Sequence, residues 1–409
     1  MGLRKLAHYA LTFAGNAVVY PLAGSQRRDP QLWVFGAPEG RFEGNSKYLY
    51  LWLHLTGHSP APVWITQDAR LVRQLRSKGM QAHSRWSSEG LRTAARAGVY
   101  FVNDNASDVN FPLSRGSVIF NLWHGVGLKN VLFGAKVGVS ATLAGKRRTY
   151  LQRIRNMRRL QRPDWVLSTS PEMSRDFFAR CFDVPLERAP ALGYPRLDPQ
   201  LDEKLRAAAT SMGDYSSLEA QGAKRRLLYA PTLRESGSHF LDRALPDLER
   251  LSSALTEQGA HLYLKLHPKM SEALPNGIKL PSNLTLLPES MDLYPVLDRF
   301  DALVTDYSSL FFDFIACRSE GVVLYTFDHE DYVRAERDLA WDYDEATVGV
   351  RAHDFSELCA IVGDGRAFAP LEPAKLAELR ERFWGGPLQP PLASQRIADF
   401  LARDAQVSR

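Results

Sequence analysis

Short apolar, β-rich runs alternate with helical patterns along all 409 residues, and this alternation constrains the fold more than any other feature. Within each run the side chains are apolar almost without a break, which is typical of parallel strands covered on both faces by helices. The predicted strands are 32–37, 62–66, 99–103, 118–124 and 165–170 in the first half, and 226–232, 261–268, 284–288, 302–309 and 321–326 in the second. Two such series predict an α/β protein with two doubly wound domains.

A polar stretch at 198–224 separates the two series of predicted strands. We therefore expect an N-terminal amphipathic segment, an N-terminal Rossmann-like domain, a C-terminal domain and a closing helix, at 1–28, 29–200, 201–392 and 393–409. The chain is 45% hydrophobic and 24% charged, which excludes a disordered chain, a collagen-like fibre and a multi-pass membrane protein. Its three cysteines lie far apart, so no disulfide framework or zinc ribbon is expected and a reducing cytoplasm is favoured.

The first 24 residues combine two early cations with apolar side chains. His8 and Asn16 interrupt the apolar run, which is also short for a helix that spans a bilayer. We interpret the segment as an amphipathic helix that either lies on a membrane or packs on the protein's own surface.

A basic tract at 129–163 holds ten Lys or Arg and no Asp or Glu. Its apolar side chains recur every third residue, at Leu151, Ile154, Met157 and Leu160. An apolar stripe framed by cations suits a helix on an anionic membrane surface, where each cation contributes about 1 kcal/mol. A solvated helix face is the plainer alternative. A nucleic-acid patch is the third, and no nucleic-acid-binding motif supports it.

In open α/β sheets, ligands bind beyond the carboxyl ends of the strands, so polar residues at those ends are candidates for a site. In the segment 121–130, NLWHGVGLKN, a predicted strand ends at His124. Imidazole titrates near neutral pH and is the commonest general base, although a histidine held in a turn is the plain alternative. Gly125, Gly127 and Lys129 follow at once and suit an anionic ligand, which favours the functional interpretation.

Two strand ends in the second half carry cations. Thr232 and Arg234 follow one strand, and Lys265 and His267 share a face at the end of the next. Arginine binds phosphate oxygens through two parallel hydrogen bonds, so both ends are candidate phosphate ligands. A turn with a surface arginine and a buried structural pair are the respective alternatives.

The segment 304–314, VTDYSSLFFDF, gives the clearest signal. Asp306 ends a strand, and Ser308 and Ser309 open an apolar helix whose free N–H groups and dipole favour an anion. An ordinary N-cap is the alternative. Met291 and Asp292 lie at another junction between a loop and a helix, where a nucleoside could be held.

Several enzyme classes lose support because their motifs are missing from the sequence. There is no Walker A motif, no GxGxxG fingerprint, no HExxH and no G-x-S-x-G. No cluster of metal-ligand residues is apparent either, so we expect neither a metal nor a cofactor.

Seven ordered motifs between residues 45 and 401 resemble the CDP-glycerol glycerophosphotransferase family of teichoic-acid primases and polymerases, with its capsule and CDP-ribitol relatives. They are WHGVGLKN, GYPRLD, YAPTLRES, KLHP, TDYSSLFFDF, DHEDYVRAERDLAWDY and PPLASQRIADFL. The resemblance implies a GT-B architecture, in which two Rossmann-like domains face each other across a cleft and the C-terminal one holds the nucleotide donor. It also implies work at the inner face of the plasma membrane on a lipid-linked acceptor, with CDP-glycerol or CDP-ribitol as donor and CMP as product.

Site residues follow from the same resemblance. His124 would be the base, and the donor diphosphate would be held by Arg234, Lys265, His267, Ser308 and Ser309. Arg196, in GYPRLD, is an additional candidate beside Gly125 and Lys129.

The sequence departs from the family pattern at three places: Val126 and Gly127 replace Thr-Pro, Leu233 replaces Trp, and residues 348–350 replace Pro-Gly-Pro. Two other functions therefore stay open. One is a sugar transferase of the same architecture that releases a nucleoside diphosphate, and the other is a catalytically silent scaffold for envelope assembly.

Overall fold

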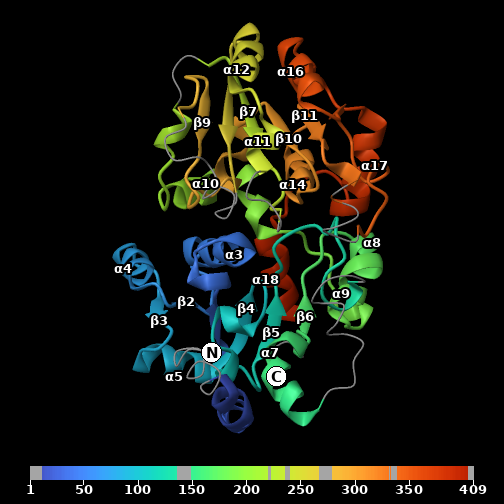
Figure 1. Ribbon diagram of the computed structural model, residues 1–409. Coiled ribbons are helices and arrows are strands. Elements are labelled where there is room, and N and C mark those ends of the chain that lie inside the picture. Colours follow the sequence, from blue (N-terminus) through green and yellow to red (C-terminus); the bar gives the residue numbers. More distant parts are fainter. Residues whose placement is uncertain are drawn as a thin grey trace, which may run out of the picture.

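A computed structural model describes residues 12–135, 149–219, 223–234, 240–266, 279–330, 332 and 339–403 of the chain. Two α/β domains lie one above the other, and each is built around a six-stranded parallel sheet (Figure 1).

The N-terminal sheet has the strand order β3-β2-β1-β4-β5-β6, and all its pairs are parallel. Its strands are β1 (Asp29–Phe35), β2 (Pro62–Thr66), β3 (Ala82–Ser84), β4 (Ala97–Val102), β5 (Val118–Asn121) and β6 (Trp165–Val166). Every residue of β2, β4 and β5 is buried, as expected for strands covered on both faces.

The C-terminal sheet repeats this plan in the order β12-β11-β10-β7-β8-β9. Its strands are β7 (Arg225–Tyr229), β8 (Ala260–Leu264), β9 (Leu284–Leu286), β10 (Ala302–Thr305), β11 (Val322–Tyr325) and β12 (Val350–Ala352). The order reverses between β1 and β4 in one sheet and between β7 and β10 in the other. Such a reversal opens a ligand crevice at the carboxyl ends of the strands beside it.

Each of the ten predicted runs contains a strand, and the α/β prediction is confirmed. Two edge strands, β3 and β12, were not predicted. Each is three residues long, too short for apolar periodicity to mark it.

Helices cover both sheets. Those of the N-terminal half are α2 (Tyr20–Ala23), α3 (Gly44–Leu55), α4 (Ala69–Ser77), α5 (Ser88–Arg96), α7 (Tyr150–Leu160), α8 (Pro171–Met173) and α9 (Ala179–Phe182). Those of the C-terminal half are α10 (Glu203–Thr210), α11 (Phe240–Ala244), α12 (Leu248–Glu257), α14 (Leu310–Cys317), α16 (Phe355–Gly363), α17 (Pro373–Trp384) and α18 (Ala393–Arg403). Many begin at a polar cap whose side chain accepts free N–H groups of the first turn, as Asp68, Ser87, Asp202, Asp247 and Asp354 do.

The closing helix α18 returns to the N-terminal domain, where its red ribbon lies beside the teal strands (Figure 1). Phe400 meets the rings of Phe120 and Trp165 edge-on. The carboxylate of Asp198 accepts the N–H groups of Ala393 and Ser394 at 2.8 and 2.9 Å, which fixes the start of the helix. The chain therefore crosses between the domains twice, and the largest apolar core runs through both.

The two predicted amphipathic segments pack on each other. In the first, of which residues 1–11 lie outside the described part, the buried Asn16 donates to the carbonyl of Ile154 in α7 at 2.8 Å. Part of the apolar stripe on α7 faces the protein. Ile154 is buried, and Met157 packs against the apolar cluster around Val34, Tyr100 and Ile119 in the N-terminal domain. Outward-facing apolar side chains remain at Phe13, Val18, Val19, Leu22, Tyr150 and Leu151. Among the described residues, no helix has the length and apolarity to span a bilayer.

Candidate active site

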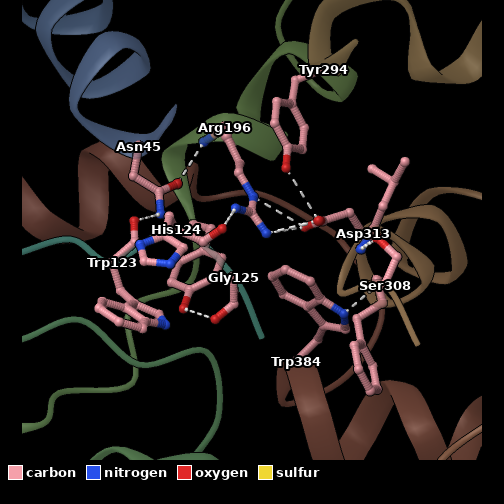
Figure 2. Close-up of polar contacts among 12 residues, drawn as sticks. Asn45, Trp123, His124, Gly125, Arg196, Tyr294, Ser308, Asp313 and Trp384 are labelled. Carbon is pink, nitrogen blue, oxygen red and sulfur yellow. Dashed lines mark hydrogen bonds and ion pairs between the residues drawn. The ribbon is translucent and has the colours of Figure 1, made fainter. Parts of the chain in front are cut away.

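The loops after β5 and β10 meet where the two domains touch. A Cβ atom added to Gly125 would lie 2.9 Å from the Ser309 hydroxyl oxygen, so these loops are in van der Waals contact. Figure 2 shows His124 and Gly125 on one side of this interface and Ser308 and Asp313 on the other. The structure thus brings together two of the strand-end motifs that the sequence singled out, 121–130 and 304–314.

The hydrogen bonding of His124 fixes its tautomer. Its Nδ1 lies 3.1 Å from the carbonyl oxygen of Asn103. Because a carbonyl oxygen only accepts, Nδ1 must carry the proton, and Nε2 is left with its lone pair. The residue as a whole is exposed, but partial desolvation and the Arg196 charge lower the pKa of its imidazole, against the raising effects of the Asn103 bond and of Asp104. His124 is therefore a neutral base near pH 7.

The loop that carries His124 is strained and tightly held. Trp123, directly before it, has a φ of +53°, a conformation that bulky residues rarely adopt. The amide of Asn45 donates to the carbonyls of Leu122 and Trp123, at 2.9 and 3.0 Å. The Asn121 side chain accepts the Trp123 N–H at 2.8 Å. Strain that persists under such restraint is typical of functional sites.

Arg196 lies behind this loop, fully enclosed (Figure 2). Its guanidinium binds both carboxylate oxygens of Asp313 in α14 at 2.7 Å and donates to the carbonyl of His124 at 2.5 Å. Tyr294 donates to the same carboxylate at 3.3 Å. With every side of the guanidinium occupied by protein, Arg196 holds the backbone of His124 against the second domain.

Residues 126–130 pack closely against both domains. A Cβ atom at Gly127 would lie 1.9 Å from the ring of Phe177, so only glycine fits there. From the other domain, the indole of Trp341 donates to the Gly127 carbonyl at 2.7 Å. The ammonium of Lys129 lies 5.2 Å from the ring centre of Tyr332. Tyr332 and Trp341 of the C-terminal domain thus contact this loop.

On the facing sheet, Asp306 is the centre of a buried network. One carboxylate oxygen accepts from the backbone and hydroxyl of Thr232, at 2.8 and 2.7 Å, and the other accepts from Arg234 at 2.8 Å. Arg234 is also paired with Asp328 and is only 6% exposed. In this structure Thr232 and Arg234 bind protein groups and fix the loop after β7.

Ser308 and Ser309 are half-buried at the start of α14, the helix that faces His124. The Ser308 hydroxyl accepts the Leu310 N–H at 3.3 Å, and the Ser309 side chain makes no capping bond. The N–H groups of Phe311 and Phe312 donate to the carbonyls of Ser308 and Ser309, and the Ser309 hydroxyl oxygen lies next to Gly125.

Four further residues were predicted to bind the nucleotide donor, and the structure describes three of them. Lys265 donates to the carbonyls of Pro288 and Glu289, and burial lowers its pKa to about 8. Asp292 accepts from Lys47 and from Tyr48, both at 2.7 Å, and so links the domains. Burial raises its pKa, but these partners outweigh burial and the net shift is downward. The other two differ again: Met291 is buried in the core, and His267 lies outside the described residues.

The family profile of CDP-Glycerol:Poly(glycerophosphate) glycerophosphotransferase matches residues 19–402. The chain belongs to this family.

Among its relatives, the teichoic acid ribitol-phosphate primase of Bacillus spizizenii is 29% identical over 243 residues, which is 58% of this chain and 59% of the primase. The teichoic acid poly(ribitol-phosphate) polymerase of the same organism is 25% identical, over 66% of this chain and 41% of the polymerase. The teichoic acid glycerol-phosphate transferase of Staphylococcus aureus is 25% identical, over 76% of this chain and 77% of the transferase. The chain thus spans about half the length of the first two relatives.

The structure of the wall teichoic acid polymerase TagF has the same fold, with a TM-score of 0.74 at 20% sequence identity. The match covers 99% of this chain and 97% of the TagF chain. The predicted GT-B architecture is therefore confirmed: two Rossmann-like parallel sheets face each other through the carboxyl ends of their strands.

Several site residues escaped the sequence analysis. Asn103 accepts from the backbone and hydroxyl of Ser46, at 3.0 and 2.9 Å, and presents its carbonyl to His124. It ends a predicted strand, so the strand-end rule could have found it. Asn45 and Asp313 carry no such signal, because their roles depend on partners in distant parts of the chain.

Proposed function

We propose that the protein transfers glycerol phosphate or ribitol phosphate from a CDP-alditol to a hydroxyl of a lipid-linked saccharide or growing polyol-phosphate chain, in the synthesis of an envelope polymer. The observation that carries this is the imidazole of His124, protonated at Nδ1, on a loop that touches the start of α14 in a member of this family. The names of the relatives support it, as does the structure of a TagF variant soaked with CDPG.

The reaction follows from the tautomer of His124. Nε2 accepts the proton of the acceptor hydroxyl, and that oxygen attacks the β-phosphorus of the donor in line. The new oxygen–phosphorus bond forms as the bond to CMP breaks, and CMP leaves with the bridging oxygen. Phosphoryl transfer depends mainly on positioning and charge stabilisation, and a positioned general base contributes about 10²–10⁴-fold.

The developing charge on the phosphoryl oxygens needs donors from the C-terminal domain. The N-terminus of α14, with Ser308 and Ser309, supplies preorganised dipoles beside the base. Lys265 and His267 remain proposed donor ligands. Thr232, Arg234 and Asp306 would act by fixing the loops around the donor. We propose no metal or cofactor in this scheme.

We also propose that the enzyme works at the cytoplasmic face of the plasma membrane, as a peripheral protein. The exposed apolar side chains of the N-terminal helix and of the first turn of α7 support this, together with the cations on α7. No nucleic-acid partner is proposed.

The decisive experiment incubates the purified protein with CDP-glycerol or CDP-ribitol and a lipid-linked saccharide, and follows nucleotide release. We expect CMP release that requires the acceptor, and a loss of about 10²–10⁴-fold in turnover for His124→Ala with donor affinity little changed. Release of CDP or UDP from a nucleotide sugar, with no CMP from either alditol donor, would contradict the proposal. Donor binding without turnover would instead indicate a silent scaffold.

A further inference from the structure

A cavity of about 430 Å³ lies in the N-terminal domain, between the last turn of α7 and the loops after β4 and β5. Ligand sites typically have volumes of about 300–1,000 Å³, so a compact ligand or part of a larger one fits here. None of the residues assigned to the reaction above lines it. Its function is therefore open.

The walls combine cations with apolar surface. Arg158 and Arg159 come from α7, and both side chains are exposed. Neither has a hydrogen-bond or ion-pair partner within the described parts of the chain. Ile119, Phe133 and Phe182 line the same space. Two unpaired guanidinium groups beside aromatic and aliphatic side chains suit phosphate groups attached to an apolar carrier.

Polar groups also line the cavity, among them the Asp104 carboxylate and the Asn105 amide, which are hydrogen-bonded to each other at 2.6 Å. Carboxylate and amide groups of this kind accept hydrogen bonds from the hydroxyls of a sugar or polyol. The lining of the cavity thus combines anion-binding and hydroxyl-binding groups.

Two contacts connect the cavity to the base. Asp104 directly follows Asn103, whose carbonyl binds the imidazole of His124, and the Asp104 charge acts on that imidazole. Phe182 packs edge-on against Trp123, the residue before His124, with ring centres 4.8 Å apart. Two lining residues, Asp104 and Phe182, are thus directly connected to the groups that hold the base.

We propose that this cavity is the acceptor site. Its arginines bind the phosphate groups of a lipid-linked acceptor, its aromatic wall packs against the apolar or sugar part, and Asp104 and Asn105 bind acceptor hydroxyls close to the residues that hold His124. The assignment rests on the proposed function and adds to it a location and a recognition chemistry for the acceptor.

The test compares the double variant Arg158→Ala/Arg159→Ala with Arg153→Ala. Arg153 is an exposed cation on the same helix that does not line the cavity, so its variant shows the effect of removing a cation from this helix outside the cavity. Kinetics use a short-chain prenyl diphosphate saccharide in micelles of a neutral detergent, which removes attraction to an anionic bilayer. We expect the acceptor KM to rise at least about tenfold in the double variant only, with the KM for the CDP-alditol unchanged in both. Equal effects in both variants, or an unchanged acceptor KM in the double variant, would overturn the proposal.

A binding measurement separates this site from the proposed function. If the wild-type protein releases no CMP with any donor, the proposed transfer fails, and titration calorimetry with the same prenyl diphosphate saccharide still tests the cavity. Binding by the wild type and by Arg153→Ala that is weakened in the double variant supports an acceptor site. Equal binding by all three proteins, or none by the wild type, overturns it. Inorganic pyrophosphate serves as a probe that has the phosphate groups without the apolar carrier. We expect it to displace the saccharide only at concentrations much higher than that of the saccharide itself. If pyrophosphate binds as tightly as the saccharide, the proposed role of the apolar wall is overturned.

Discussion

At the scale of single residues, the chemistry of His124 depends on neighbours that bear no catalytic signature. A backbone carbonyl sets its tautomer. The net shift of its pKa is downward, chiefly because of desolvation, and this keeps the imidazole neutral. Asp104 opposes that effect, since a nearby negative charge favours the imidazolium ion. The balance of these effects sets the pH below which the base is lost.

Replacing Asp104 by Asn should lower the pKa of His124 further, because the variant removes a charge that favours the protonated ring. The base then stays unprotonated to lower pH, so the acidic limb of the profile of kcat/KM against pH moves to lower pH. Histidine NMR of the free enzyme checks the same pKa directly, with His124→Ala to assign the resonance. Asp104→Glu retains the charge and should leave the limb close to its wild-type position. An acidic limb that moves upward in the Asn variant would contradict this account.

At the scale of elements, the loop 121–130 lies between the two domains and contacts both of them. Strand-end polarity marked it as a candidate site, a role that stays a prediction, but gave no sign that both domains hold the loop by its backbone. Gly127 illustrates this: its hydrogen lies against Phe177 from one side, and its carbonyl accepts the Trp341 indole from the other. The departure from the family pattern at Val126 and Gly127 is therefore matched to close packing around this loop.

Gly127→Ala should lower the free energy of unfolding by about 1–3 kcal/mol, because the new methyl group overlaps the Phe177 ring and the core must shift. Turnover should fall with it, since the loop carries His124. Phe177→Leu removes the end of the ring, so the double variant should be more stable than the sum of the two single losses predicts. Denaturant unfolding of the four proteins measures the coupling. Strict additivity would show that Gly127 and Phe177 do not meet as described.

At the scale of the whole molecule, the sequence predicted the two sheets well and the docking between them poorly. Long apolar runs mark buried strands wherever they occur, so all ten appeared in the right place. Arg196 and Asp292 were predicted to meet a ligand, yet their side chains bind the opposite domain. A polar residue at a strand end lies near both the ligand and the partner domain, and local patterns do not distinguish the two. Arg234 was likewise predicted to bind a ligand, and it forms two buried ion pairs within its own domain, with Asp306 and Asp328.

The buried pair of Arg196 and Asp313 gives the sharpest test of domain docking, since both side chains are at most 2% exposed. Arg196→Met should lower the free energy of unfolding by about 3–5 kcal/mol, because it leaves the Asp313 carboxylate buried without a cation. In Arg196→Met/Asp313→Leu no charge is left unpaired, so most of that loss should be recovered. Arg206→Met is the matched control: its bridge to Asp298 is about one-third exposed, and we expect a change of at most about 1 kcal/mol.

Turnover should separate stability from positioning in the same set of variants. The double variant still lacks the hydrogen bond from Arg196 to the His124 carbonyl, so CMP release should stay low although the protein is stable. Denaturant unfolding and CMP release, measured on the same preparations, give the two readouts. A double variant as unstable as Arg196→Met would mean that the buried charge is not the cause of the loss. A double variant that turns over like the wild type would show that Arg196 is needed neither for domain docking nor for holding His124 in place.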